Sequence, residues 1–190
     1  MKQARVVVTF KCPRSCPGCC NTYSSIMASA KTIHNFDGLK DYDVIMLTGG
    51  EPMLFPDRTI KMADIIHKKA PNAKIFLYTA LHKSDGDLSR VLQHVDGVQF
   101  SLHAEANDKD IEEFHKFQEV AKKHVGSKSF RLYIDSAMPK ELQQKVRVNR
   151  SVWKRFEVKP WSSEEELLAK QPKGLPSGED LFVLQRSPNG

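Results

Sequence analysis

The chain has 190 residues, of which 40% are hydrophobic and 27% charged, and its formal net charge is +6 at pH 7. This composition is typical of one soluble globular domain with a sizeable core. No apolar run reaches the roughly 18 residues of a membrane helix, which excludes a membrane-spanning protein.

The N-terminal segment contains a short apolar run at residues 5–10. This run is shorter than the apolar core of a secretory signal peptide, so we expect a cytoplasmic protein without a membrane partner. Reducing conditions in that compartment disfavour a disulfide framework. The cysteines therefore call for another explanation.

Strands and helices alternate along the chain with little sequence between them. Apolar and β-branched runs predict six strands, in chain order at residues 5–10, 44–50, 74–80, 97–104, 130–138 and 155–161. Apolar residues at helical spacing predict helices at residues 57–70, 87–95, 107–125 and 139–147. Such alternation is typical of a parallel sheet with right-handed crossovers.

The predicted fold class is α/β, a partial (βα)6 barrel with an open parallel sheet and outer helices, because a closed barrel needs eight repeats. Residues 1–161 are expected to form this core domain. Residues 162–190 mix charges with proline and glycine and predict a C-terminal extension that packs on the core. Within it, residues 181–186 could add a short strand, and the end is expected to be flexible.

Polar residues and cysteines follow the predicted strands where each strand ends. The cysteines follow the first strand, the sequence GGEP (49–52) follows the second, Thr79 closes the third, and Ser101 and His103 close the fourth. Ligands of parallel α/β sheets bind at the carboxyl ends of the strands. We therefore expect all of these residues at one rim.

All four cysteines of the chain lie within nine positions, at Cys12, Cys16, Cys19 and Cys20. The adjacent Cys19 and Cys20 point apart, which leaves three natural ligands, Cys12, Cys16 and Cys19, and one spare thiol. Three thiolates on a [4Fe–4S] cluster leave one iron open to a small molecule. The alternative is a structural zinc site, which takes four ligands and is closed.

Two motifs together resemble the radical S-adenosylmethionine (radical SAM) enzymes. CPRSCPGC (12–19) is similar to their Cx3Cx2C cluster loop, and LTGGEP (47–52) to their glycine-rich element after the second strand. The resemblance implies a [4Fe–4S] cluster on Cys12, Cys16 and Cys19, whose open iron chelates S-adenosyl-L-methionine. Reductive cleavage of this cofactor would give a 5′-deoxyadenosyl radical that abstracts hydrogen from a substrate.

The resemblance also implies how GGEP contacts the cofactor. Gly49 and Gly50 lack Cβ and let the backbone approach the methionine ammonium, Glu51 offers a negative acceptor, and Pro52 stiffens the turn. The alternative for Glu51 is capping of a helix N-terminus. We name Glu51 and His103 as candidate catalytic residues.

Further cofactor contacts are expected from Thr79, Ser101 and His103, with ordinary strand-end hydrogen bonding as the alternative for the last two. Asp135 interrupts an apolar strand, and a buried carboxylate needs a partner, so it is a candidate ribose or substrate contact. Two further expectations concern aromatic side chains. Gly18 stands where the family often has an aromatic residue, so Tyr23 or Phe10 could pack on the adenine. Separately, Trp153 or Trp161 could line the substrate pocket.

Basic residues gather in residues 2–31 and 122–155, where they either attract phosphate or form solvated faces. We therefore expect a phosphate-bearing substrate, a nucleotide or nucleic-acid base that the enzyme rearranges or modifies, such as a hypermodified thymine isomerised in viral DNA. The alternatives are an activase that installs a glycyl radical on a partner enzyme, a relative of 7-carboxy-7-deazaguanine synthase, and a zinc-dependent nucleic-acid binder. The radical chemistry implies a reductant such as flavodoxin or ferredoxin as partner.

Overall fold

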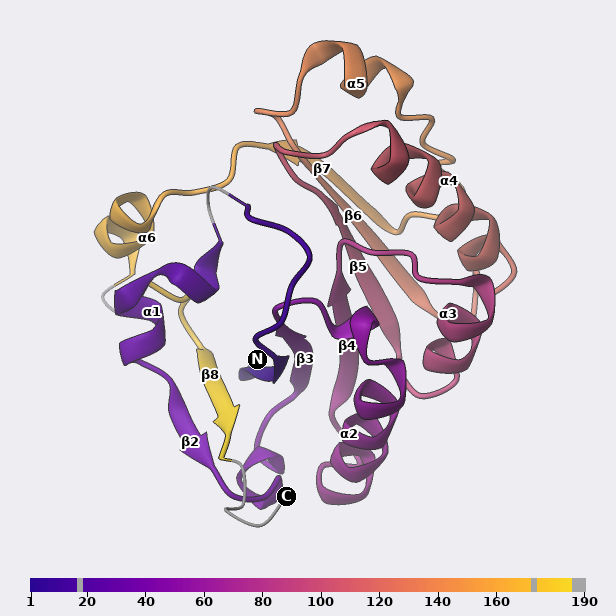
Figure 1. The fold of residues 1–190 in the computed structure, drawn as a ribbon. Helices are drawn as coiled ribbons and strands as arrows, with labels where there is room; N and C mark the ends of the chain where they lie inside the picture. The colour runs from indigo at the N-terminus through magenta and orange to yellow at the C-terminus, as the bar shows by residue number, and fades with distance from the viewer. Residues whose placement is uncertain (17–18, 172–173, 186–190) are drawn as a thin grey trace.

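The computed structural model describes residues 1–16, 19–171 and 174–185. Its centre is an eight-stranded sheet in the order β2-β8-β1-β3-β4-β5-β6-β7, in which every neighbouring pair is parallel. The sheet is strongly curved and stays open between the edge strands β2 and β7 (Figure 1). The strands span β1 Gln3–Thr9, β2 Lys31–Ile33, β3 Val44–Gly49, β4 Lys74–Thr79, β5 Gly97–Leu102, β6 Ser129–Asp135, β7 Arg155–Lys159 and β8 Glu179–Leu184.

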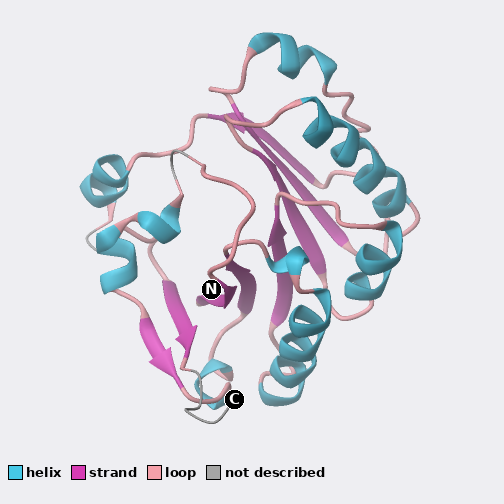
Figure 2. Ribbon diagram, viewed as in Figure 1, coloured by secondary structure: helices cyan, strands magenta, loops and turns pink. Residues whose placement is uncertain are grey.

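Helices cover the outer face of this sheet (Figure 2). Three of them, α2, α3 and α4, pack side by side over the central strands, whereas α1 and α6 lie together near β8. Their bounds are α1 Ser24–Ala28, α2 Pro56–Lys69, α3 Asp85–Leu92, α4 Asp108–Lys122, α5 Lys140–Lys145 and α6 Glu164–Lys170, with short 3₁₀ helices η1 Cys20–Thr22, η2 Asp37–Leu39 and η3 Pro52–Leu54. Within the described ranges, no helix has both the length and the apolar character needed to cross a membrane.

The predicted α/β open parallel sheet with outer helices is confirmed, and it has eight strands instead of six. All six predicted strands and all four predicted helices are present, with ends shifted by a few residues. The prediction missed β2, α1 and α6. Each of these elements has seven residues or fewer, too few for a clear hydrophobic period.

The C-terminal segment contributes β8, which was predicted at residues 181–186. The strand lies between β1 and β2 and pairs in parallel with both. It therefore extends the sheet on the side of the first strand and lies far across the sheet from β7, the strand that precedes it in the chain. The last four residues, 187–190, which were expected to be flexible, lie outside the described residues.

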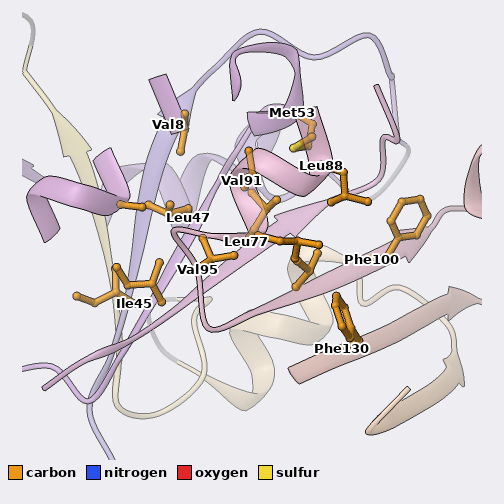
Figure 3. Packing of buried hydrophobic residues seen from close by; sticks show 14 of the residues in the cluster. Val8, Ile45, Leu47, Met53, Leu77, Leu88, Val91, Val95, Phe100 and Phe130 are labelled. Carbon is orange, nitrogen blue, oxygen red and sulfur yellow. The ribbon is translucent and has the colours of Figure 1, made fainter. Parts of the chain in front are cut away.

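The hydrophobic core lies between the sheet and the outer helices (Figure 3). Alternate residues of the central strands, among them Leu47, Leu77 and Phe100, point into this layer and are fully buried. From α4, Phe114 and Phe117 meet them, as their helical spacing predicted. The other alternate residues of the same strands face the concave inner side of the sheet.

Trp153 belongs to the core. Its ring stacks near Phe114 and Phe117, and its Nε1 donates a hydrogen bond to Gln118 Oε1 at 2.8 Å. The alternative that Trp153 lines a substrate pocket does not fit this position, whereas Trp161 does line the inner cavity.

Candidate iron–sulfur site

A cavity of about 670 Å³ occupies the concave side of the sheet and extends from the amino ends of the strands to their carboxyl rim. Its wall includes nearly the whole predicted site: Cys12, Cys16, Cys19, Gly49, Gly50, Glu51, Thr79, Ser101 and His103. The rim expectation is therefore met, because the parallel strands bring these residues together from four separate chain segments. Pro52 and Asp135 are buried but are not part of the cavity wall.

The glycine turn packs directly against the backbone of the cysteine loop. Gly50 N donates to Thr9 O at 2.6 Å and Glu51 N donates to Lys11 O at 2.9 Å. A Cβ on Gly50 would lie 2.2 Å from Lys11 O, and one on Gly49, whose φ is +115°, would lie 2.5 Å from Thr9 O. Both glycines are thus required by the contact between the two motifs, before any ligand is considered.

Glu51 is buried, and both oxygens of its carboxylate accept hydrogen bonds from the chain itself. Oε1 accepts from Met53 N at 2.9 Å and from Thr79 Oγ1 at 2.6 Å, while Oε2 accepts from Ala80 N at 2.9 Å. Burial raises the pKa of Glu51, and these hydrogen bonds act against that rise. The side chain caps η3, so the capping alternative describes its contacts, and Thr79 is its partner.

The cysteine loop is anchored to the rim by Arg14, which sequence reasoning did not single out. Its guanidinium donates to both carboxylate oxygens of Asp110, at 2.6 and 3.1 Å, and to Ala80 O at 2.9 Å. Asp110 also accepts from Asn107 N in the capping box of α4. Burial would raise the pKa of Asp110, but the hydrogen bonds from Arg14 and Asn107 outweigh this and leave it below its ordinary value.

The three described cysteines carry free thiols on the cavity wall. Cys16 Sγ donates to Glu105 Oε1 at 2.8 Å, and Glu105 Oε2 is buried without a partner among the described residues. Burial raises the pKa of both Cys12 and Cys16, and for Cys16 the carboxylate of Glu105 adds to the rise. Binding of iron must therefore displace protons from these thiols.

This donor set fits a cluster better than a single ion. No three Cys, His, Asp or Glu side chains in the described part of the chain converge closely enough to hold one metal ion. A zinc site requires four ligands around one point. Separate thiols that face a shared cavity suit a four-iron cluster, because each thiolate binds a different corner.

His103 and Ser101 line the cavity beside aromatic rings. The His103 ring lies 4.6 Å from that of Trp161, which in turn lies edge-on to Tyr133 at 5.4 Å. Burial lowers the pKa of His103, so the imidazole is neutral near pH 7. This wall can offer a neutral ring nitrogen, a hydroxyl and an aromatic surface to a ligand.

Other predicted contacts lie elsewhere. Asp135 Oδ1 accepts from Ala137 N at 2.9 Å, so its partner is the turn that follows β6. Tyr23 packs in a small second core with Ile26 and Leu181, and its hydroxyl donates to Ser162 O. Phe10 is exposed. Gly18 and the side chain of Cys20 lie outside the described part of the structure.

The inner face of the sheet adds cavity residues that sequence reasoning missed, chiefly Gln99, Arg131 and Tyr133. A signal was present in the strands, where polar residues alternate with apolar ones, as in FRLYID (130–135). We interpreted these strands as near-continuous apolar runs. The alternation instead marks a solvated inner face.

An open parallel α/β sheet with a cysteine loop bound to a glycine turn at its carboxyl rim defines a radical SAM-type iron–sulfur protein. Residues 4–125 match the family model described as a 4Fe–4S single cluster domain, and the chain belongs to that family. The matched span covers the cysteine loop, the glycine turn and the strands β1 to β5. The family therefore confirms the resemblance and the [4Fe–4S] cofactor.

Three solved structures are similar to this chain in part. BtrN, in complex with AdoMet and 2-DOIA, matches with a TM-score of 0.44 and 18% identity over 69% of this chain and 56% of BtrN. Proteus mirabilis N-acetylneuraminate lyase matches with a TM-score of 0.45 and 11% identity over 96% of this chain and 63% of the lyase. 3-Hexulose-6-phosphate synthase matches with a TM-score of 0.40 and 13% identity over 96% of this chain and 89% of the synthase. The chain thus spans less than two thirds of the first two proteins, and no curated protein matches it.

Proposed function

We propose that this protein is a radical SAM enzyme in which Cys12, Cys16 and Cys19 hold a [4Fe–4S] cluster and the open iron binds S-adenosylmethionine. One observation carries the proposal: the three thiols and the turn Gly49–Gly50–Glu51 line a single cavity. The match to BtrN, whose structure contains AdoMet, agrees with the proposed cofactor. When bound, the reduced cluster and S-adenosylmethionine would supply a 5′-deoxyadenosyl radical that abstracts hydrogen from the substrate.

The chain's own groups would position these ligands. Glu51 acts as a positioning residue, since its three hydrogen bonds fix the glycine turn against the cysteine loop. Gly49 and Gly50 then present backbone polar groups to the methionine moiety at the cavity wall. Ser101 and neutral His103 are placed to hydrogen-bond the ribose hydroxyls, while Trp161 and Tyr133 exclude water from the reacting atoms.

The proposed substrate is a nucleotide or a nucleic-acid base, which the enzyme rearranges after hydrogen abstraction. A hypermodified thymine of viral DNA, isomerised by this route, is the specific substrate that we propose. The basic side chains of the cavity, Arg131, Arg155 and Lys159, support a substrate that carries phosphate. A base within a duplex must be extruded before a ring atom can react.

A protein reductant such as flavodoxin or ferredoxin would supply the electron. Cys12 is exposed, so the cluster corner that it holds would lie near the protein surface. Lys11 and the exposed Phe10 stand beside it in the chain. These features support reduction at this end of the cysteine loop.

The test is anaerobic reconstitution with iron and sulfide, followed by measurement of 5′-deoxyadenosine formed from S-adenosylmethionine under a chemical reductant. DNA, nucleotides and no substrate are compared. Stimulation by DNA or nucleotide supports the proposed substrate class. Product formed without such stimulation, but increased by a glycyl-radical partner enzyme, would instead support an activase.

The cysteines provide the matched control. Cys12→Ala, Cys16→Ala and Cys19→Ala should each abolish cleavage and reduce cluster absorbance, whereas Cys20→Ala should retain the cluster. Iron and sulfide analysis with electron paramagnetic resonance measures this independently of activity. Loss of the cluster in Cys20→Ala would show that the assignment of ligands is wrong.

A further inference from the structure

On the inner face of the sheet, Arg131 carries a charge for which the described part of the chain offers no carboxylate partner. Elsewhere in the cavity Arg5 pairs with Glu179 at 2.6 Å, Arg14 pairs with Asp110, and Arg155 and Lys159 both contact Glu157. Arg131 has no ion pair with any of the described residues. Its guanidinium is only partly exposed, so its charge lacks both full hydration and a counter-ion.

Arg131 is nevertheless held in place. The guanidinium lies over the ring of Phe76, 4.2 Å from its centroid. Stacking of this kind fixes the plane of an arginine while leaving N–H groups free to donate. A pre-oriented fork of donors is suited to the two oxygens of a phosphate or carboxylate.

The sheet places a second donor beside this fork. Gln99 of β5 pairs in register with Arg131 of β6, so the two side chains are neighbours on the inner face. The Gln99 amide lines the cavity and makes no side-chain hydrogen bond to any described residue. Arg155 follows in the same row on β7 and adds positive charge, although Glu157 partly neutralises it.

The depth of this row sets what it can contact. In β5 and β6, Ser101 pairs with Tyr133, two residues closer to the rim than Gln99 and Arg131. Two residues of a strand correspond to about 6–7 Å. An anion on Arg131 would therefore lie below the level of Ser101 and His103, towards the amino ends of the strands.

We propose that Arg131 and Gln99 form an oxyanion subsite inside the barrel, which binds a phosphate or carboxylate group of the substrate. The proposal rests on the proposed function in taking this cavity as the substrate site. It deepens that function by assigning the anionic group of the substrate to two named side chains. The anion is then either the phosphate of a free nucleotide or an acidic substituent on the base.

The experiment measures binding to the reconstituted holoenzyme under anaerobic conditions by calorimetry. The probes are inorganic phosphate, thymidine 5′-monophosphate, thymidine and acetate. In the parent protein, the monophosphate should bind at least about tenfold more tightly than thymidine, because one charge-assisted hydrogen bond to the phosphate contributes that much binding free energy. Preference for phosphate identifies the nucleotide source, and preference for acetate identifies a carboxylate on the base.

Arg131→Met removes the charge but keeps an apolar chain over Phe76, and it should weaken anion binding by about 10- to 100-fold. Gln99→Leu should have a smaller effect. The matched control is Arg58→Met, which removes an exposed arginine from α2 on the outer face. Should Arg131→Met fail to fold, as judged by circular dichroism, Arg131→Lys keeps the charge, loses the fork and should still lose several-fold in affinity.

Two outcomes separate this proposal from the proposed function. Equal affinity of the parent and Arg131→Met for phosphate and acetate, or no binding of either anion, would overturn the subsite even if 5′-deoxyadenosine is formed normally. Anion binding that depends on Arg131 in a protein that never cleaves S-adenosylmethionine would support the subsite and refute the radical chemistry.

Discussion

Replacing Glu51 with glutamine tests whether this residue holds the glycine turn. The carboxylate accepts hydrogen bonds from Met53 N, Thr79 Oγ1 and Ala80 N, all buried. A glutamine oxygen can replace Oε1, but its NH₂ group would then face the Ala80 N–H, donor against donor. An unsatisfied buried N–H costs about 1–3 kcal/mol, and each of the two remaining bonds weakens when the charge is lost.

Relief of the buried charge offsets part of this loss, as the raised pKa of Glu51 indicates. We therefore expect Glu51→Gln to lower the free energy of unfolding by about 2–3 kcal/mol. Urea unfolding of the metal-free protein, reduced and kept from oxygen, measures it. Glu112→Gln on the exposed face of α4 is the control and should change stability by less than about 0.5 kcal/mol.

Binding of S-adenosylmethionine to Glu51→Gln provides a second, independent prediction. Both oxygens of the Glu51 carboxylate already accept hydrogen bonds from the chain. Loss of this carboxylate in Glu51→Gln should therefore weaken S-adenosylmethionine binding only to the extent that the glycine turn loosens. A variant as stable as the parent that no longer binds S-adenosylmethionine would refute the positioning role. It would instead place Glu51 in direct contact with the cofactor, as the sequence motif implied.

Three further predictions concern the rim. Asp110→Ala leaves Arg14 without its carboxylate partner and should lower the free energy of unfolding in urea by about 3–5 kcal/mol. Because the pKa of Asp110 is lowered in the folded protein, this stability difference between parent and variant should be full above about pH 4 and should shrink as the pH falls further. Because the pKa of His103 is lowered by folding, the unfolded chain is protonated at this residue at a higher pH than the folded protein. The free energy of unfolding should therefore fall as the pH drops below about 6.5, and His103→Gln should flatten this pH dependence. Gly50→Ala places a methyl group 2.2 Å from a carbonyl oxygen of the cysteine loop and should reduce both stability and iron content, whereas Gly86→Ala in α3, with open space around it, should stabilise by up to about 1 kcal/mol. A Gly50→Ala protein that binds iron like the parent would contradict the packing argument.

Much of the fold was predictable from the sequence because it depends on local pattern. The apolar runs of β1, β3 and β4 are short and bounded, and the apolar stripe of α4 repeats at helical spacing, so their existence required no tertiary information. Elements such as β2, with two exposed residues of three, carry no such pattern. The capping box of Ser163 and Glu166 was a signal for α6 that the prediction did not use.

The functional groups divide in the same way. The sequence by itself determined the cysteine loop, the glycine turn and their meeting at one rim, because motif spacing and the parallel direction of the strands are properties of the chain. Only the tertiary structure decided that Arg14 meets Asp110, 96 residues away, and that the Glu51 carboxylate accepts hydrogen bonds from Thr79 and two backbone N–H groups. It also placed Arg131 on the cavity wall without an ion pair to any residue that the structure describes. Such contacts depend on which strands become neighbours and in what register, and a partner many residues away leaves no mark on the local sequence.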